Sequence, residues 1–301
     1  MFHHFHDETH PNVQGAISAD QLRKMLEKLG PERFLSPQEW SERALSGSLR
    51  KDDLCLTLDD ALLCQHDVAL PVFEEFGLKA FWFVYSSVFE GTIERLELYR
   101  YFRTVHYPEI DTFYRAFSAT VREEAPDAYD AKQRSFNPAR YLAAFAFYSD
   151  ADRWFRYLRD ELLGATRYNE IMDRMIAQSG LVASELRDRL WMNNDHLANL
   201  VHSGHVIGLH STTHPTRLER MSKAEQEQEY RHNLDHLSKV TGVRPHSMSH
   251  PCNSYSSQTL ELLYEMDIKI GFRSNMAQDS AHGLLEFPRE DHANLLRTLN
   301  L

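Results

Sequence analysis

Two pairs of closely spaced polar residues carry the chemistry that this sequence suggests. Asp59 and Asp60 directly follow the apolar run LCLTL, and His210 and His214 stand four residues apart in GLHSTTHP. Adjacent carboxylates repel each other unless a cation or a proton relieves them. Imidazoles four residues apart on one turn can reach a common metal ion. The alternative is a capping Asp beside a solvated acid, with two of the chain's 17 histidines four apart by chance.

The elements around these pairs favour the metal site. Asp53 to Leu58 and Ala80 to Tyr85 read as buried strands separated by a helix that ends at Gly77, which is a strand-helix-strand unit with parallel strands. A further strand is predicted from His205 to His210. Both ligand-rich segments therefore follow the carboxyl ends of parallel strands, where barrel active sites are built.

The remaining pattern continues the alternation of helices and strands. The periodicity predicts helices over 18–29, 195–203, 222–241 and 258–266, a loop over 245–254 and a strand over 268–272. The charged run SKAEQEQEYRHN within the third of these helices reads as a solvated face without function.

Residues 90–194 have a different texture. Strand signals vanish there, and apolar and aromatic residues such as Trp154, Phe155 and Leu158 recur at helical spacing. We expect an all-helical block whose aromatic residues pack its own core, with a sugar-stacking platform as the alternative. The block is expected to serve as a cap or as an interface between copies of the chain.

Composition excludes several classes of protein. The chain has 301 residues, 42% of them hydrophobic, which excludes disorder, and its net charge of −11 argues against a nucleic-acid partner. It has no apolar run of about 18 residues, so no transmembrane segment is expected. Three cysteines are too few for a disulfide framework, and the start MFHHFHDETH has no apolar signal core. These features predict a cytoplasmic protein.

Several segments resemble one family, the polysaccharide deacetylases of the NodB-homology group, also called carbohydrate esterase family four. LTLDDALL resembles the first motif, T-F-D-D-G, and HSTTHP matches the second, H-[ST]-x-x-H-P. SGHVIGLHS and SHPCNSYSSQTLELLYEMDIKIGF resemble the flanking and third-motif regions, and the opening residues resemble the first strand and loop. The resemblance implies an α/β fold, a distorted (β/α)7-type NodB-homology barrel over 1–89 and 195–301. Residues 90–194 would be an inserted all-helical subdomain.

The resemblance also implies roles for individual residues. Asp60, His210 and His214 would bind a divalent cation, with zinc favoured and cobalt, nickel or manganese as alternatives. Asp59 would be the catalytic base. Three protein ligands leave a cation with open positions for water and a substrate oxygen, so the chemistry of these residue types agrees.

Departures from the family pattern lead to further expectations. Ala61 replaces the glycine of the first motif, which is tolerable if its φ stays negative. Asn253 replaces the third-motif glycine, and asparagine accepts positive φ. Ser249 stands where the family usually has the arginine that positions the base, and we expect Arg289 to substitute for it.

The general acid is not recognisable from the family's late Leu-x-His motif. His292 is the expected stand-in, with His250 as the alternative, although a surface histidine is the commoner role of any single histidine taken alone. Of the N-terminal histidines, His4 resembles a family position, whereas His3 and His6 read as mobile.

The sequence thus predicts a metal-dependent carbohydrate N-deacetylase, a hydrolase of linear amide bonds in glycan biosynthesis. Its substrate would be an N-acylated sugar, a nucleotide-sugar or a lipid-linked sugar, and the helical block could support a homo-oligomer. Alternatives are a non-catalytic carbohydrate-binding relative, a deformylase and a related amide or imide hydrolase.

Overall fold

The structure, a computed structural model, describes residues 1–142, 149–276 and 283–301. The chain divides into two compact units, which we call the barrel unit (Met1–Glu94 and Arg187–Leu301) and the helical unit (Arg95–Leu186). Residues 90–94 and 187–194, assigned to the insertion above, lie in the barrel unit.

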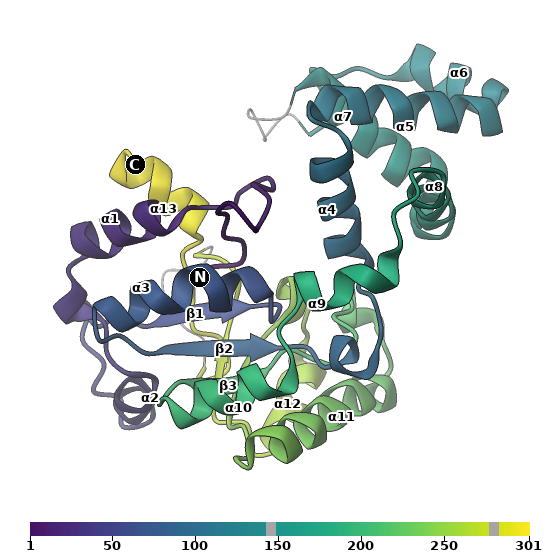
Figure 1. Ribbon diagram of the computed structural model, residues 1–301. Coiled ribbons are helices and arrows are strands. Elements are labelled where there is room, and N and C mark those ends of the chain that lie inside the picture. Colours follow the sequence, from purple (N-terminus) through teal and green to yellow (C-terminus); the bar gives the residue numbers. More distant parts are fainter. Residues whose placement is uncertain (143–148, 277–282) are drawn as a thin grey trace. The chain divides into compact units, whose positions relative to one another are not determined.

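A five-stranded parallel sheet forms the centre of the barrel unit (Figure 1). Its strands follow the chain order β1 to β5, and each pairs with the next in parallel. They are β1 (Leu56–Asp59), β2 (Ala80–Val84), β3 (Val206–Leu209), β4 (Ser247–Ser249) and β5 (Ile270–Phe272). The parallel α/β fold expected from the sequence is therefore confirmed.

Two further chain positions extend this sheet and join its edges. Phe2 bridges Leu58 of β1, and Phe287 bridges Phe272 of β5, both in parallel. The amino group of Met1 then donates to the carbonyl of Glu290 at 2.9 Å. The five-stranded sheet is thus continued by a single bridge at each edge, which matches a distorted α/β barrel of this type.

Strand β4 corrects the prediction of a loop over 245–254. All three of its residues are buried, and Ser247 and Ser249 pair with Ile270 and Phe272 of β5. Two serines in three residues lack the apolar character typical of a buried parallel strand. The strand forms because its neighbours β3 and β5 supply its hydrogen bonds.

Aromatic side chains fill the interior of the barrel. Phe81, Phe83 and Phe272 are almost fully buried there, with ring centroids 5.4 to 5.8 Å apart. Trp40 of α2 packs against the same cluster. On β3, a Cβ at Gly208 would lie 2.6 Å from the ring of Phe83, so glycine makes room for that ring.

Helices cover the outside of the barrel, and capping residues in the sequence mark where they begin and end. Ser18 and Gln21 form a capping box at the start of the first helix, and Gly30 ends it with φ 85°. The helices of this unit are α1 (Ala19–Leu29), α2 (Pro37–Leu45), α3 (Leu70–Glu75), α9 (Arg187–Leu190), α10 (Asn194–His202), α11 (Lys223–Thr241), α12 (Ser257–Glu265) and α13 (His292–Leu299). The helices predicted from periodicity agree with these within one or two residues.

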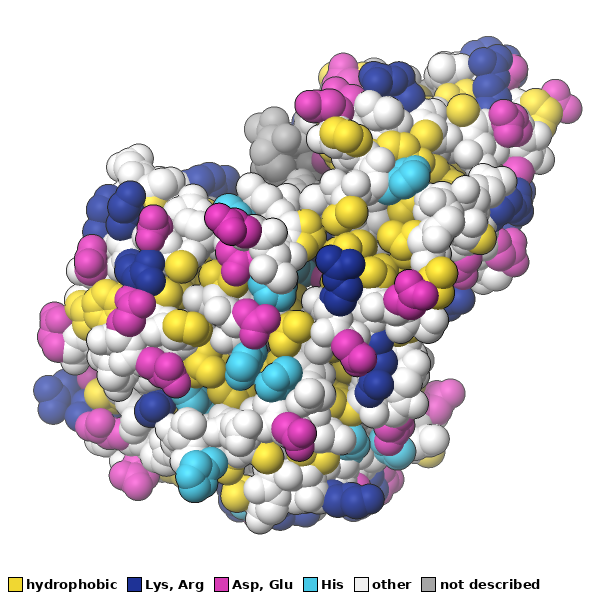
Figure 2. All heavy atoms as spheres, viewed as in Figure 1, with side chains coloured by type: hydrophobic (Ala, Val, Ile, Leu, Met, Phe, Trp, Pro, Cys, Tyr) yellow, Lys and Arg dark blue, Asp and Glu magenta, His cyan; other side chains and the backbone are white. Residues whose placement is uncertain are grey.

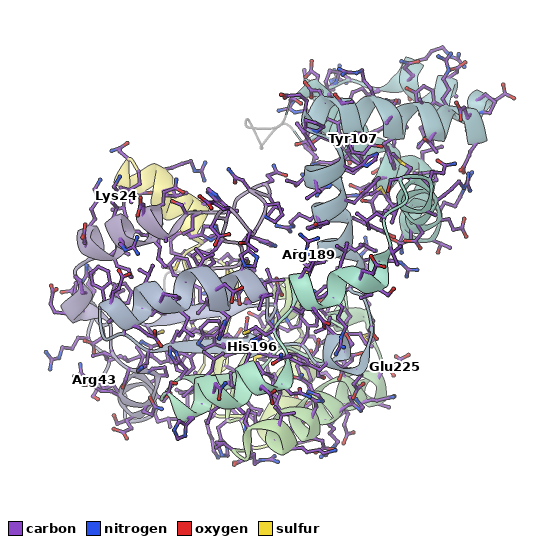
Figure 3. All side chains as sticks on the ribbon, viewed as in Figure 1. Lys24, Arg43, Tyr107, Arg189, His196 and Glu225 are labelled. Atoms are coloured by element: carbon purple, nitrogen blue, oxygen red, sulfur yellow. The ribbon has the colours of Figure 1, made fainter. Side chains whose placement is uncertain are left out.

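Over the residues that the structure describes, the helical unit contains helices and no strand. They are α4 (Arg95–His106), α5 (Ile110–Glu124), α6 (Pro126–Ser135), α7 (Asp150–Tyr157) and α8 (Gly164–Gln178). Phe113, Phe117 and Phe155 are buried among them, with centroids 5.0 to 6.0 Å apart. Tyr107, labelled in Figure 3, joins this packing through Phe113. These aromatic side chains form the unit's own core.

Acidic and basic side chains are interspersed on the face shown in Figure 2. Histidine side chains also reach this face of the barrel unit, next to acidic ones. Among the described residues, no helix is both long and apolar enough to cross a membrane.

Candidate active site

The carboxyl ends of the strands bring the predicted residues together. Asp59 is the last residue of β1 and Asp60 follows it, while His210 directly follows β3. Ser249 ends β4, and Arg289 comes from the segment that bridges β5. Because all strands are parallel, these ends lie at one mouth of the barrel.

Asp60, His210 and His214 form a group that could hold one metal ion. Nε2 of His210 and Nε2 of His214 lie 3.4 and 3.5 Å from Oδ1 of Asp60. Tetrahedral coordination with bonds of about 2.0–2.1 Å separates ligand atoms by about 3.3–3.4 Å. Oδ1 of Asp60 is buried and accepts no hydrogen bond from the described residues. The three side chains therefore fit a divalent cation, whose charge would satisfy this oxygen.

Backbone and side-chain contacts orient His210 toward this group. Its Nδ1 lies 2.8 Å from the carbonyl of Ser249, to which it donates, so the lone pair of Nε2 is left facing Asp60. The backbone N–H of His210 donates to Oδ1 of Asn233, and Nδ2 of the same side chain donates to the carbonyl of Val84. Asn233 of α11 thus ties the end of β3 to the end of β2.

The loop between the two histidines is held by one glutamate. Glu229 of α11 accepts from the backbone N–H groups of Thr212 and Thr213 at 2.9 and 2.8 Å, and from the hydroxyl of Thr213 at 2.7 Å. Glu229 lies in the charged run that was predicted to be a solvated face. That prediction is wrong, because Gln226 and Tyr230 of the same run are fully buried.

The turn after β1 is strained. Asp60 and Ala61 have φ of 82° and 55°, so the expected negative φ at Ala61 is wrong. Left-handed backbone costs a residue with Cβ about 1–2 kcal/mol. The turn is held from both sides, since the N–H of Asp60 donates to Phe83 and the carbonyl of Ala61 accepts from Met192. In this backbone conformation the Asp60 side chain lies next to His210 and His214.

Asn253 behaves as expected from its sequence position. It has φ 56°, and its Oδ1 accepts from the backbone N–H of Ser274 at 3.1 Å. Asparagine therefore takes the left-handed conformation that a glycine would otherwise provide.

Asp59 forms a buried ion pair with Arg289. The two guanidinium nitrogens Nη1 and Nη2 donate to its two carboxylate oxygens at 2.7 Å each. Nη2 also donates to Oγ of Ser249 at 2.6 Å, and that hydroxyl donates to Asp59 at 3.2 Å. Arg289 therefore places its charge beside the residue where the family usually has arginine.

This pair keeps Asp59 ionised. Burial by itself would raise the pKa of Asp59, but the charge of Arg289 and the nearby His210 more than offset burial and hold the pKa at about 2. Arg289 is fixed in turn by the carbonyl of Arg273, to which its Nε donates at 2.6 Å. Asp59 is thus a rigidly oriented carboxylate.

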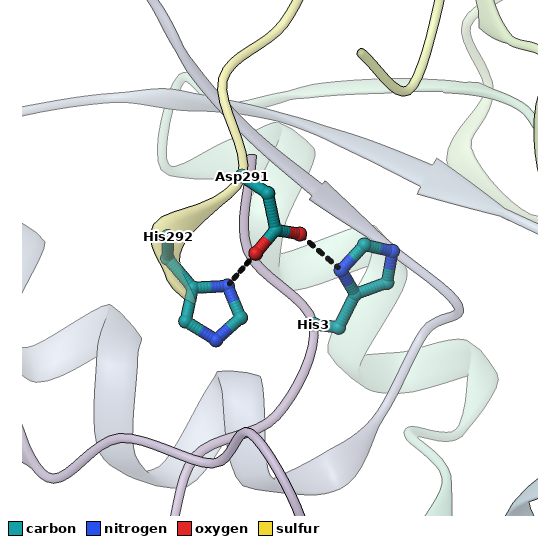
Figure 4. Close-up of side chains that lie close together, drawn as sticks. All are labelled: His3, Asp291 and His292. Carbon is teal, nitrogen blue, oxygen red and sulfur yellow. Dashed lines mark ion pairs between the residues drawn. The ribbon is translucent and has the colours of Figure 1, made fainter. Parts of the chain in front are cut away.

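His3 is a residue of this site that the sequence reasoning missed. Its Nε2 lies 3.8 Å from Oδ2 of Asp59, and its Nδ1 lies 4.0 Å from Oδ2 of Asp291 (Figure 4). The expectation that His3 is mobile is wrong, because Phe2 beside it bridges β1. Burial lowers the pKa of His3 to about 4 although Asp60 and Asp59 oppose this, so the ring is neutral at pH 7. The alternation of MFHHFH was the available signal.

His292 and His250 are tied to backbone carbonyls. Nε2 of His292 donates to Gly15 at 2.7 Å, and its Nδ1 lies 3.4 Å from the carbonyl of Met1. His292 also belongs to a possible ligand group with His3 and Asp291 (Figure 4). Nε2 of His250 donates to Leu285 at 2.8 Å. In both histidines the Nε2–H is therefore already donated to a backbone carbonyl, so it is not available as a proton donor to a substrate.

Comparison with known proteins identifies similar sequences and structures. Residues 167–271, which include both histidines of the second motif, match the family model described as polysaccharide deacetylase. No curated protein gives a significant match.

Solved structures share the fold over almost the whole chain. The deacetylase PplD of Streptococcus pyogenes, in complex with acetate, is 17% identical with a TM-score of 0.56, over 99% of this chain and 95% of that one. A de-N-acetylase from Aggregatibacter actinomycetemcomitans is 12% identical with a TM-score of 0.55, over 96% and 91%. IcaB from Ammonifex degensii is 13% identical with a TM-score of 0.52, over 96% and 88%. At these identities the likeness concerns the fold.

Proposed function

We propose, from the premise that this chain belongs to the polysaccharide deacetylase family, that it is a metal-dependent hydrolase that removes an N-acyl group, in the first instance N-acetyl, from a sugar. The reaction adds water across the amide bond and yields a carboxylate and a free amine. The observation that carries the proposal is the grouping of Asp60, His210 and His214 beside the Asp59–Arg289 pair.

Asp60, His210 and His214 would hold the cation. When bound, a divalent cation, with zinc favoured, polarises a carbonyl oxygen and lowers the pKa of water. The protein supplies two imidazoles, of which His210 is held with its Nδ1 on the carbonyl of Ser249, and one carboxylate, a common ligand set of zinc hydrolases.

Asp59 would act as the base. It is ionised, buried and held in one orientation by both nitrogens of Arg289, so it can take a proton from the attacking water without reorganising. Arg289 is a positioning residue in this scheme.

His3 would pass the proton to the leaving amine in place of His292. Its ring lies between Asp59 and Asp291, and about a quarter of the side chain is exposed. A neutral imidazole next to the protonated base can accept its proton and donate it to the departing nitrogen. The test is His3→Gln, which should retain metal and lower kcat, with the change confined to one limb of the pH profile.

The substrate that we propose is a small N-acylated sugar, a nucleotide-sugar or a lipid-linked sugar of a glycan pathway in the cytoplasm. This proposal rests on the family and on the acidic composition. Recovery of the native protein from a periplasmic or culture-supernatant fraction would contradict the location.

One experiment tests the function. Purified protein is analysed for bound metal and assayed for acetate release from N-acetyl sugars, nucleotide-sugars and lipid-linked sugars. His210→Ala and His214→Ala should lose both metal and turnover, whereas the surface control His202→Ala should lose neither. Full metal stoichiometry in both ligand variants would place the metal elsewhere.

The products separate the alternatives. Sugar binding without any released acid indicates a non-catalytic relative. Release of formate indicates a deformylase, and ring opening to a carboxylate without acetate indicates an imide hydrolase.

A further inference from the structure

His3, Asp291 and His292 form a second group of side chains that could hold one metal ion (Figure 4). One nitrogen of each histidine and one carboxylate oxygen of Asp291 all lie within 4.8 Å of one another. Nδ1 of His3 lies 4.0 Å from Oδ2 of Asp291, and Nδ1 of His292 lies 3.8 Å from Oδ1. The group shares no residue with the candidate metal centre described above, so it is a separate set of ligands.

The hydrogen bonds of His292 leave a lone pair facing Asp291. Nε2 of His292 donates to the carbonyl of Gly15 at 2.7 Å, so in the neutral ring Nδ1 carries no proton. Burial lowers the pKa of His292, which favours this neutral form. Nδ1 therefore lies near two acceptors, the carbonyl of Met1 at 3.4 Å and the carboxylate of Asp291 at 3.8 Å. Electron-rich atoms this close to one another repel unless a cation lies between them.

His3 has a similar arrangement with a different acceptor. Its Nε2 faces Oδ2 of Asp59 at 3.8 Å, and its Nδ1 faces Asp291. A neutral imidazole carries one proton, so His3 can turn an N–H toward only one of these two carboxylates. Histidines that bind metal ions almost always hold their other N–H against a carbonyl, a carboxylate or water. The carbonyl of Gly15 has this role for His292, and Asp59 lies on the corresponding side of His3.

The carboxylate of Asp291 keeps one oxygen available to a cation. Its Oδ1 accepts from the backbone N–H of Ala293 at 2.8 Å and so caps α13, whereas Oδ2 faces His3. Over the described part of the chain, no lysine or arginine forms an ion pair with this carboxylate. The side chains of His3 and Asp291 are 26% and 30% exposed. Solvent therefore reaches the group, and a bound cation would compensate the charge of Asp291.

We propose that His3, Asp291 and His292 bind a second divalent transition-metal ion, with zinc favoured, through Nδ1 of each histidine and the carboxylate of Asp291. Two imidazoles and one carboxylate suit zinc, cobalt or nickel, whereas magnesium and calcium prefer oxygen ligands. The distances of 3.8 and 4.0 Å to Asp291 exceed the about 3.3–3.4 Å of tetrahedral coordination, so the side chains must draw together on binding. This ion should therefore bind more weakly than the ion at Asp60, and should be lost when the protein is purified without added metal.

Occupation of this second site should inhibit the hydrolase, a consequence that rests on the proposed function. With Nδ1 bound to a cation, the ring proton of His3 stays on Nε2, which faces Asp59. Nε2 then has no lone pair to accept the proton that Asp59 takes from water. We expect zinc in excess of the first site to lower kcat at least about tenfold, since a proton-transfer group contributes about 10² to 10⁴.

Zinc binding to the full chain is measured by isothermal titration calorimetry, without a polyhistidine tag because such a tag would itself bind zinc. The double variant His210→Ala with His214→Ala lacks the first site and should still bind one zinc ion. Adding Asp291→Asn should weaken this binding at least about tenfold, since even outer-shell partners of a metal contribute that much. Asparagine caps helices as well as aspartate does, so α13 is retained. Glu290→Gln, which changes the neighbouring acid outside the group, should leave the affinity unchanged.

The wild-type chain gives a second measurement that does not require the double variant to fold. It should bind two zinc ions in two steps, and Asp291→Asn should bind only the tighter one. An excess of Mg²⁺ should not displace the weaker ion. No zinc binding by a folded double variant, or two ions in Asp291→Asn, would overturn the proposal.

Inhibition is measured separately from binding. Excess zinc should lower the turnover of the wild type and of Glu290→Gln, whereas Asp291→Asn should keep the turnover that it shows with one zinc ion. Equal inhibition of all three proteins would overturn the coupling to His3. If the chain released no acid from any N-acyl sugar, the proposed function would fail, while the binding measurements would still decide whether the second site exists.

Discussion

Replacing Arg289 should disrupt both the stability of the barrel and its chemistry. The side chain makes two 2.7 Å bonds to Asp59 and one of 2.6 Å to Ser249, all buried. Removing one partner of a buried ion pair costs about 3–5 kcal/mol, because the other charge is left without compensation. We expect Arg289→Ala to lose about this much free energy of unfolding at pH 7. Turnover should fall by about 10² to 10⁴, the contribution of a well-placed base.

A swap of two residues makes the prediction sharper. Polysaccharide deacetylases usually have arginine at the position of Ser249, and its Oγ lies 3.2 Å from Asp59. An arginine rooted on β4 can therefore reach the same carboxylate. The double variant Ser249→Arg with Arg289→Ser should recover most of the stability and part of the turnover lost in Arg289→Ser alone. Ser249→Arg alone should be destabilised, because it crowds two guanidinium groups around one carboxylate.

The pH dependence of the free energy of unfolding gives an independent measure of the Asp59–Arg289 ion pair. The pKa of Asp59 is about 2 in the folded protein and ordinarily 3.8, so its stabilisation is complete above about pH 4 and is lost as the pH falls toward 2. Without Arg289 the largest charge that lowers this pKa is lost while burial remains, so we expect the pKa of Asp59 to rise and its pH-dependent stabilisation to shrink. Urea unfolding of both proteins from pH 3 to 7 measures the difference. A cost below about 1 kcal/mol at pH 7, together with parallel pH profiles, would refute the reasoning.

Four further predictions concern other parts of the chain. Asp59→Asn should bind metal fully and lose turnover by about 10² to 10⁴, measured at saturating metal; wild-type turnover would show that Asp59 is not the base. Glu229→Ala should weaken metal binding about tenfold in a competitive chelator titration by releasing the loop between the histidines. Glu227→Ala, on the same helix but paired with Arg231 and not with the loop, should not. Equal affinities would contradict the tethering role. The pKa of His205 is about 4 in the folded protein and ordinarily 6.5. As the pH falls below 6.5 the ring is therefore protonated more readily in the unfolded state, which lowers the free energy of unfolding by up to about 3 kcal/mol once the pH is below 4. His205→Asn keeps an acceptor for the two N–H donors without titrating, and unfolding curves should show a shallower loss of stability between pH 6.5 and 4; an unchanged slope would exclude His205. We also propose that the helical unit caps the active site, because it is inserted after the carboxyl end of β2: a Gly-Ser linker in place of 95–186 should retain metal and raise KM sharply, while a monomeric product with unchanged kinetics would indicate an interface instead.

Local sequence was sufficient where the chemistry is local. The spacing of Asp59 from Asp60 and of His210 from His214 is set by neighbouring residues on one turn, and apolar runs placed both pairs at strand ends. Helix boundaries were equally readable, because capping residues such as Ser18 act within three or four residues along the chain.

Tertiary structure decided how distant residues complete the site. Arg289 was expected to position the base only from the family resemblance, since it lies 230 positions from Asp59, and the link of Glu229 to Thr212, from a helix to a loop, was not expected at all. Charge pattern along the chain cannot show such pairs, so the run containing Glu229 was misread as a solvated face. His3 lies beside Asp59 because the adjacent Phe2 bridges Leu58 of β1.

The same distinction holds for the backbone. The left-handed conformation of Ala61 goes against its intrinsic preference and exists because Phe83 and Met192 hold the turn from both sides. Strand β4 has little strand character of its own and forms because β3 and β5 offer unpaired backbone groups on either side. The sequence by itself predicted the α/β class and the candidate metal ligands, because each of the two ligand motifs is a short run of neighbouring residues. The partners that orient those ligands depended on the free energy of packing segments that are far apart in the chain.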